Sequence, residues 1–395
     1  MLTKSTNITK KNIYSTTHFR FLRSGDEFFY FLHELITNAK NEIHLQFYIW
    51  EDDETGNFLI PPLLDAIKRG VKIYIVLDAY GSSGFSGEIR NKLESAGVII
   101  KLYSRIFSKK RIQLGRRMHQ KIVVVDGIHA LVGGINISNN YKGTSQSTAW
   151  LDFAAYTRGE VSIAIRNDCI KKWKLAEQKK LFTDNYTKNT SIEKGSISIS
   201  LLENDWLKGK LEISRYYRQL IRESKQELIL VASYFLPGIR LKRLLKKAAK
   251  RGVKICFIVP SKSDVAIVEY ATEYFYAWMI KNNFSIYKWK NGMVHGKVAI
   301  ADTTSVTIGS YNINWLSDYG SLEYNIVLHN QEEILSVKNQ LQEIIKNECV
   351  EIKNTEVEFT YFKKIKNWIS FLLVRLSLNV LMLVIKKPAK KLSKK

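Results

Sequence analysis

Hydrophobic and polar positions along the chain follow the same order twice. In residues 28–50, FFYFLHELITNAKNEIHLQFYIW, apolar positions recur every three to four residues and then crowd together, and residues 211–235 repeat this pattern. The first period predicts a helix, and the apolar run predicts a buried strand. Nearly identical text follows in each half, AIKRGVKIYIVL at 66–77 and AAKRGVKICFIV at 248–259. It predicts a basic helix end, a glycine stop and a second buried strand.

This repeat predicts the architecture. Strands that alternate with helical patterns indicate an α/β protein with a central sheet covered on both faces. We therefore expect two similar α/β/α lobes, related by a pseudo-twofold axis. The first lobe is predicted over residues 1–190 and the second over residues 191–350. Their join is expected in the polar stretch 183–195, which has no periodicity and many turn-forming residues.

The tail, residues 351–395, follows a different pattern. Residues 368–385 are almost long enough and apolar enough for a membrane span, but Arg375 and Asn379 interrupt them. Lysines crowd both ends of the segment. This pattern favours a hydrophobic or amphipathic helix that lies in an anionic membrane interface. A helix docked on the protein body is the alternative.

The composition indicates that the binding partners are anionic but does not distinguish one class of anionic partner from another. Lys and Arg number 61 against 37 Asp and Glu, a formal charge of +24. A field of that sign attracts nucleic acid, anionic lipid surfaces or phosphorylated substrates. Cys169, Cys256 and Cys349 lie far apart, which argues against a disulfide framework and a zinc site and favours a reducing compartment. The first twenty residues contain no apolar segment of a secretory signal.

A short motif with the spacing H-x-K-x4-D occurs once in each half. The first copy is His119, Lys121 and Asp126, and the second is His295, Lys297 and Asp302. The apolar residues between Lys and Asp predict a strand, whose alternation places His and Lys on one face. Paired small residues follow, and they permit close approach of the next strand. The polar residues near them, expected to bind phosphate, are Asn136, Ser310 and Asn312.

Two such motifs suit chemistry on a phosphodiester. A neutral imidazole can displace one ester oxygen and form a phosphohistidine, which divides one difficult step into two easier ones. A second, protonated imidazole can give its proton to the leaving alkoxide. Lysines and amides then hold the phosphoryl oxygens, and neither a metal nor another cofactor is needed. Asp126 and Asp302 complete the motifs, and because they end apolar strands we interpret them as anchors for the following loop.

The paired motifs resemble those of the phospholipase D superfamily. The resemblance covers residues 21–329, and within the superfamily it is greatest to the shorter bacterial cardiolipin synthases. It implies that Asp152 and Glu323 each orient a catalytic histidine, that His119 is the nucleophile and that His295 is the acid. One departure lies after the second motif, where the usual Asp and Pro are replaced by Asn314 and Trp315. This departure affects the expected acceptor site more than the chemistry.

The resemblance implies a transphosphatidylase that condenses two phosphatidylglycerols to cardiolipin and glycerol at the cytoplasmic side of the cell membrane, with peripheral or tail-anchored attachment. A phospholipase D that releases phosphatidic acid, a nuclease of the same superfamily and a non-catalytic membrane scaffold are the alternatives. The basic charge would also suit nucleic acid, although the apolar tail favours lipid. The sequence leaves the oligomeric state open.

An aromatic stripe in the second half has two interpretations. Tyr270, Tyr274, Phe275 and Trp278 recur at helical spacing. Such a stripe is more often part of a core, but it could also line a groove for an acyl chain.

Overall fold

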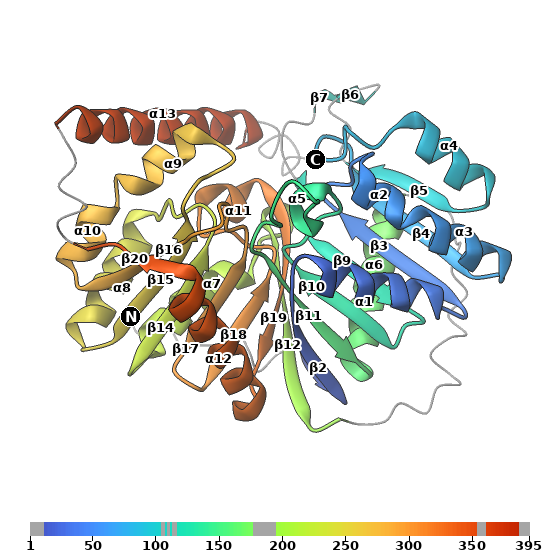
Figure 1. Ribbon diagram of the computed structural model, residues 1–395, viewed down its shortest axis with the longest axis horizontal. Coiled ribbons are helices and arrows are strands. Elements are labelled where there is room, and N and C mark those ends of the chain that lie inside the picture. The colour runs from blue at the N-terminus through green and yellow to red at the C-terminus, as the bar shows by residue number, and fades with distance from the viewer. Residues whose placement is uncertain are drawn as a thin grey trace, which may run out of the picture.

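The computed structural model describes residues 12–103, 107–108, 111–112, 117–176, 195–353 and 361–386. Figure 1 shows two α/β lobes side by side. The first lobe is built on a seven-stranded sheet. Its strands are β2 (His18–Arg23), β3 (Glu42–Phe47), β4 (Lys72–Asp78), β5 (Ile99–Tyr103), β9 (Lys121–Val125), β10 (His129–Gly133) and β11 (Phe153–Arg158). Its helices are α1 (Asp26–Thr37), α2 (Glu54–Phe58), α3 (Ile60–Lys68), α4 (Gly87–Ser95), α5 (Asn139–Lys142) and α6 (Glu160–Ala176).

The second lobe is built on an eleven-stranded sheet. Its strands from residue 195 onward are β12 (Ile197–Asp205), β13 (Lys210–Leu211), β14 (Glu227–Ala232), β15 (Lys254–Pro260), β16 (Phe284–Trp289), β17 (Lys297–Ala301), β18 (Ser305–Gly309), β19 (Ser321–Leu328) and β20 (Cys349–Glu351). Its helices are α7 (Glu212–Glu223), α8 (Ile239–Lys250), α9 (Ala266–Glu273), α10 (Tyr276–Lys281), α11 (Trp315–Tyr319), α12 (Gln331–Glu348) and, beyond residue 360, α13 (Tyr361–Lys386).

Both lobes have one strand order, which confirms the predicted duplication. The first sheet runs β2-β11-β10-β9-β3-β4-β5, and the second contains β12-β19-β18-β17-β14-β15-β16. In each lobe the last three strands are parallel and the others antiparallel. The glycine stops after α3 and α8 also match, because Gly70 and Gly252 have φ of 84° and 87°.

Two segments from the first half extend the second sheet. Strand β1 (Ile13–Thr16) pairs with β12, and the short strand β8 (Arg117–Met118) pairs with β19. The remaining strands, β6 (Phe107–Ser108) and β7 (Arg111–Ile112), pair with each other. The two halves are therefore interleaved in the second sheet, where β1 forms an edge and β8 pairs with the first residues of β19. The predicted boundary at residue 190 lies outside the described residues.

The lobes share one apolar core. It contains Val132 and Phe153 from the first sheet, Ile308 and Ile326 from the second, and residues of α6 and α12. Each lobe also has a separate core on the other side of its sheet. Burial of apolar area on this scale opposes separation of the lobes. Matching loops of the two halves are consequently held at fixed positions relative to one another.

The aspartate of each motif closes a turn after its strand. Asp126 and Asp302 have φ of 50° and 54°. The carboxylate of Asp126 accepts hydrogen bonds from the backbone N–H groups of Lys40, Asn41 and Glu42, at 2.9, 2.7 and 3.1 Å. Asp302 accepts three equivalent bonds, of 2.8 to 2.9 Å. In both lobes the aspartate thus connects the motif to the loop that precedes the first parallel strand.

We expect Asp126→Ala to lower the free energy of unfolding by about 3 kcal/mol, because three backbone donors lose a charged acceptor. Denaturant-induced unfolding measures the change. The residual folded enzyme should keep its turnover number. A variant of unchanged stability that had lost its activity would show that the carboxylate acts in the chemistry instead.

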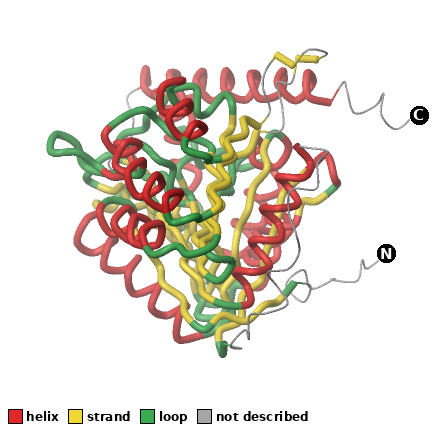
Figure 2. Tube along the Cα trace, turned by 90° about the vertical axis from the view of Figure 1, so that its right-hand side faces the viewer, coloured by secondary structure: helices red, strands yellow, loops and turns green. Residues whose placement is uncertain are grey.

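Helix α13 lies along the second lobe beside α9 (Figure 1). Phe371 stacks on Tyr274 with ring centroids 4.8 Å apart, and Lys363 forms an ion pair of 3.1 Å with Glu273. The helix is therefore docked on the protein body, as the alternative prediction had it (Figure 2). None of the helices within the described part of the chain is long and apolar enough to cross a membrane.

The outward face of α13 is also apolar. At 100° per residue, the docked positions, which include Asn367 and Phe371, lie opposite a set of exposed hydrophobic residues. These are Tyr361, Phe362, Ile365, Trp368, Ile369, Leu372, Leu373, Leu376 and Val380. An exposed apolar patch of this kind marks a site of interaction with another molecule or with a membrane.

Candidate active site

Each motif histidine is attached by its backbone to the other lobe. The N–H of His119, which directly follows β8, donates to the carbonyl of Leu322 at 3.0 Å. In the same way, the N–H of His295 donates to the carbonyl of Leu151 at 2.8 Å. Both histidines precede their strands, and the lysines begin β9 and β17. The crossed backbone bonds place both motifs at the junction of the lobes.

The carboxylate that orients each histidine also comes from the opposite lobe, so that the contacts are crossed. Nδ1 of His119 lies 2.9 Å from Oε2 of Glu323, and Nδ1 of His295 lies 2.6 Å from Oδ2 of Asp152. Both carboxylates are completely buried. The geometry therefore pairs the histidine of each half with the acidic residue of the other half. Such a bond fixes the ring orientation and leaves Nε2 for chemistry.

Both lysines are buried, and each lies beside the histidine of its own motif. Nζ of Lys121 and Nζ of Lys297 donate to the carbonyls of His119 and His295, respectively. Burial, followed by the charge of Lys297, lowers the pKa of Lys121 to about 7. Burial also lowers the pKa of Lys297 to about 8, against the opposing effect of Asp152. Cations held so close together are poised to bind an anionic phosphoryl group.

These pKa values predict a pH dependence for substrate binding. Each lysine carries its charge below its pKa, so the cations that hold an anion are lost as pH rises through about 7 for Lys121 and about 8 for Lys297. We expect KM for an anionic phosphodiester to rise by up to about tenfold per pH unit for each lysine lost. Steady-state kinetics from pH 6 to 9 measure it.

Lys121→Arg provides the control, because arginine keeps its charge throughout this range. It should remove the lower of the two inflections. A KM that stays constant from pH 6 to 9 in the unsubstituted enzyme would contradict the assignment of the lysines to phosphate binding.

The histidines and Asp152 are shifted toward their neutral forms. Burial lowers the pKa of His119, while the charge of Glu323 acts to raise it. Burial and the charges of Lys297 and Lys121 lower the pKa of His295 well below its usual value. Burial raises the pKa of Asp152 to about 7. A neutral Asp152–His295 pair consequently retains a proton near neutral pH, whereas neutral His119 is free to act as a nucleophile.

The paired small residues keep the next strand close. A Cβ atom added to Gly133 would lie 2.4 Å from the carbonyl oxygen of Phe153, and one added to Gly309 would lie 2.3 Å from that of Tyr324. The second small residue of each pair meets a carboxylate. A Cβ on Gly134 would lie 2.3 Å from Oδ1 of Asp152, and the hydroxyl of Ser310 donates to Oε2 of Glu323 at 2.5 Å.

We expect Gly134→Ala to reduce kcat by about 10²-fold, because the new methyl group displaces Asp152 from His295, and a shift of about 1 Å has that effect. Initial-rate kinetics measure the loss. Gly87→Ala is the matched control, since its Cβ atom would meet nothing within 4 Å. Equal rates for the two variants would show that the position of Asp152 is unimportant for turnover.

The three predicted phosphate-binding residues are used in different ways. Ser310 supports Glu323, as described. The amide of Asn136 is engaged with protein groups, since Oδ1 accepts from the N–H of Ile49 at 3.0 Å and Nδ2 donates to the Tyr141 hydroxyl at 2.7 Å. Asn312 is buried, and its Oδ1 has no hydrogen-bond partner within the described residues. Of the three side chains, Asn312 therefore has the oxygen that the surrounding protein leaves unbonded.

Aromatic residues that the sequence analysis did not select also surround the histidines. The Tyr141 hydroxyl lies 3.3 Å from Nδ1 of His295, and the Tyr48 ring lies 5.1 Å from that of His119. Tyr48 also lies beneath Lys121, with Nζ 5.2 Å from the ring centroid. Tyr48 follows an ordinary buried strand, and no spacing in the sequence distinguishes it from core aromatics. Only the fold brings it to the site.

Comparison with known proteins identifies the family. The family model "Cardiolipin synthase, PLD-like domain" matches residues 32–150 and 217–345, which include both motifs. Cardiolipin synthase B of Escherichia coli strain K12 is 29% identical over 359 residues, covering 90% of this chain and 87% of that protein. Cardiolipin synthase B of Salmonella typhi is 31% identical over the same lengths. The chain therefore belongs to the phospholipase D-like family of the cardiolipin synthase type, and it is an enzyme of the phosphatidyltransferase class.

Solved structures show the same fold at low sequence identity. The crystal structure of phosphatidylserine synthase from Haemophilus influenzae Rd KW20 covers 95% of this chain and 97% of that chain, with a TM-score of 0.73 and 16% identity. Polyphosphate kinase from Porphyromonas gingivalis covers 86% of this chain, with a TM-score of 0.58 and 13% identity. The fold is thus shared by proteins that are named for different activities, and the phospholipid class of substrate follows from the family.

Proposed function

We propose that this enzyme condenses two phosphatidylglycerol molecules to cardiolipin and glycerol through a phosphohistidine intermediate. The observation that carries the proposal is the pair of histidines, each held at Nδ1 by a buried carboxylate from the opposite lobe. Relatives named cardiolipin synthase support the choice of lipid. No metal or cofactor takes part in the proposed steps.

In the first step, Nε2 of His119 attacks the phosphorus of one phosphatidylglycerol. The new P–N bond forms as the P–O bond to the headgroup glycerol breaks, and Nε2–H of His295 protonates the departing alkoxide. A hydrogen on Nε2 requires that Nδ1 of His295 accept a hydrogen bond. Two neighbours can donate to it, namely Asp152 with its raised pKa and Nζ of Lys297, 2.6 Å away. The donor's proton passes to Nδ1 as Nε2 gives up its own, so the imidazole stays neutral, and the transfer is reversed in the second step.

The second step reverses the roles around a new acceptor. Nε2 of His295, now without its proton, accepts one from a hydroxyl of the second phosphatidylglycerol. That oxygen attacks the phosphorus, the P–N bond to His119 breaks, and cardiolipin is formed. Lys121 and Lys297 hold the negative charge that develops on the phosphoryl oxygens in both steps.

The test is the lipid product formed when purified enzyme acts on phosphatidylglycerol vesicles, beside a His119→Ala control. Cardiolipin and glycerol in equal amounts, absent from the control, support the proposal. Phosphatidic acid alone would show that water is the acceptor and that the enzyme is a hydrolase. Cleavage of added DNA with no lipid turnover would overturn the lipid assignment.

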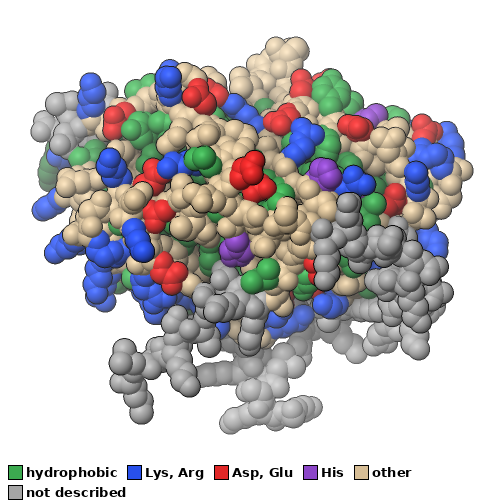
Figure 3. All heavy atoms as spheres, turned by 90° about the horizontal axis from the view of Figure 1, so that it is seen from below, with side chains coloured by type: hydrophobic (Ala, Val, Ile, Leu, Met, Phe, Trp, Pro, Cys, Tyr) green, Lys and Arg blue, Asp and Glu red, His purple; other side chains and the backbone are tan. Residues whose placement is uncertain are grey.

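We further propose that the enzyme binds an anionic membrane surface peripherally, through the outward face of α13. Its exposed residues include Trp368, Leu372 and Leu376. Figure 3 shows the opposite side of the molecule, where charged side chains of both signs are spread over both lobes. The large apolar face of α13 is therefore better suited to enter a lipid interface.

Replacing Trp368, Leu372 and Leu376 together by serine is expected to weaken binding to phosphatidylglycerol vesicles by at least about tenfold, because each side chain contributes roughly 1 kcal/mol or more on burial. Vesicle co-sedimentation measures the change. A triple serine variant at Leu207, Leu335 and Val350, which are equally exposed elsewhere, is the control. Equal binding by both variants would exclude α13 as the membrane contact.

A further inference from the structure

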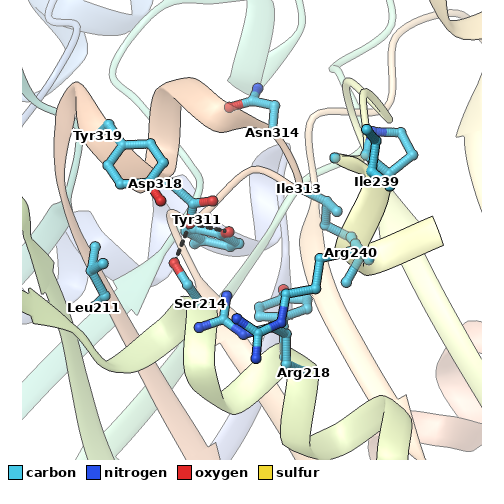
Figure 4. A pocket seen from close by; sticks show the side chains of 14 residues that line it. Leu211, Ser214, Arg218, Ile239, Arg240, Tyr311, Ile313, Asn314, Asp318 and Tyr319 are labelled. Atoms are coloured by element: carbon cyan, nitrogen blue, oxygen red, sulfur yellow. Dashed lines mark hydrogen bonds between the residues drawn. The ribbon is translucent and has the colours of Figure 1, made fainter. Parts of the chain in front are cut away.

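A cavity of about 640 Å³ opens in the second lobe, away from the histidine pair (Figure 4). Its walls come from α7, from the loop before α8 and from the loop between β18 and α11. Neither motif histidine nor motif lysine lines it. The volume is typical of a site for a small molecule or for the headgroup region of a lipid.

Two arginines project into this cavity. Figure 4 shows the guanidinium groups of Arg218, on α7, and Arg240, on α8, as neighbours. Burial and the charge of Arg240 lower the pKa of Arg218. Neither guanidinium forms a hydrogen bond or an ion pair with any described residue. Two cations held together in this way are stabilised by an anion that lies between them, and a phosphodiester fits a guanidinium in bidentate geometry.

One carboxyl group, that of Asp318, lines the same cavity, and its charge acts on Arg218. It accepts hydrogen bonds from the hydroxyls of Tyr311, at 2.8 Å, and Ser214. Burial raises the pKa of Asp318. Two arginines against one carboxyl group leave the cavity with a net positive charge.

The beginning of α8 adds donors to the same wall. This helix has 12 residues, and its N-cap Gly238 provides no side-chain cap. The first backbone N–H groups of a helix have no partner within it, and those of Ile239, Arg240 and Leu241 belong to residues that line the cavity. Together with the two arginines, they form a site for one anionic group.

An apolar groove of about 240 Å³ adjoins the cavity. The segment Pro237, Gly238 and Ile239 forms part of both walls. The groove is lined mainly by apolar side chains, which include Tyr274 and Phe275 from the aromatic stripe and Phe371 and Val374 of the docked helix α13. Lys242 and Arg375 also line it. A polar, doubly cationic cavity and an apolar groove with a common wall match the two parts of a phospholipid.

We propose that the second lobe binds an additional anionic phospholipid, distinct from the one attacked by His119. Its phosphodiester lies between Arg218 and Arg240 at the start of α8, and one acyl chain lies in the groove beneath α13. The choice of phosphatidylglycerol as this lipid rests on the proposed function. The loop from Ser310 to Asn314 connects the two sites, since Ser310 contacts Glu323 while Tyr311 and Asn314 line the cavity.

The test uses full-length His119→Ala enzyme, which cannot turn over, and dihexanoyl phosphatidylglycerol below its micelle concentration. Isothermal titration calorimetry gives the number of lipids bound per chain. Arg218→Gln with Arg240→Gln should lower this number by one, or weaken one site by at least about tenfold. Arg215→Gln with Arg243→Gln removes the same charge from positions of the same two helices that do not line the cavity, and should change nothing. Equal titrations of the two double variants overturn the proposal.

Two further titrations identify the ligand that binds in the cavity and the groove. Glycerophosphoglycerol and inorganic phosphate carry the anion without an acyl chain, and Val374→Trp fills the groove. Short-chain lipid should bind at least about tenfold more tightly than either probe, and Val374→Trp should remove that advantage. Equal affinity for lipid and the chain-free probes would overturn the lipid assignment of the cavity. If the product assay yields no cardiolipin but the lipid site that depends on the two arginines persists, the proposed function is overturned and the proposal of the lipid site stands.

Discussion

His119→Ala is expected to reduce turnover of phosphatidylglycerol by about 10⁴-fold or more, since the atom that attacks phosphorus is removed. Release of glycerol measures the rate. His33→Ala, on α1, is a control that should retain full activity, because Thr37 of the same helix is the one hydrogen-bond partner of His33 among the described residues. Activity of His119→Ala within about tenfold of the unsubstituted enzyme would show that the nucleophile lies elsewhere.

A substrate with a good leaving group separates the roles of the two histidines. A nitrophenyl phosphodiester needs little protonation of its leaving oxygen, so His295→Ala should recover much of its lost activity on this substrate. His119→Ala should recover none, because a nucleophile is needed whatever the leaving group. Recovery by His119→Ala instead of His295→Ala would exchange the two assignments.

Glu323→Gln and Asp152→Asn are each expected to reduce kcat by about 10² to 10⁴-fold. The first amide keeps the shape but can fix the wrong tautomer of His119, and the second has no acidic proton to pass to Nδ1 of His295. The crossed contacts make a sharper prediction in double variants. Glu323→Gln should add little further loss to His119→Ala, and Asp152→Asn should add little to His295→Ala. The pairs taken within each lobe should instead behave as nearly independent losses.

Rates for the four single and four double variants, with the thermal midpoint of each, decide between a positioning role and a structural one. A purely structural role would lower the midpoint and leave the pH profile of the folded fraction unchanged. Burial raises the pKa of Asp152 to about 7, so Asp152→Asn should remove an inflection near that pH. Coupling of Asp152 to His119 and not to His295 would contradict the crossed arrangement.

Much of the fold was accessible from the sequence because the duplication repeats local signals. The near-identical text at 66–77 and 248–259 predicts matching helix ends and strands, and both are present as α3–β4 and α8–β15. The two motifs also identified the family. These features depend on spacing along the chain, which one sequence displays directly.

The crossed contacts could not be predicted in the same way. Spacing relates Asp152 to His119 within one half, but the bond that forms joins Asp152 to His295. Whether Asp152 bonds to His119 or to His295 depends on how the two sheets pack through their shared core. Likewise, the pattern of 361–386 does not show which face of the helix is covered, and only the fold determines that it packs beside α9.

Because each histidine is oriented by a carboxylate from the other lobe, one lobe alone cannot form a complete catalytic pair. One lobe by itself contains a histidine without its carboxylate and a carboxylate without its histidine. A polypeptide with one such motif would have to assemble with a second copy before it could react. Joining the copies in one chain removes the concentration dependence of that assembly. It also lets each half specialise. The two halves already differ beside the motif lysines, where Tyr48 lies next to Lys121 and its counterpart Ser233 next to Lys297.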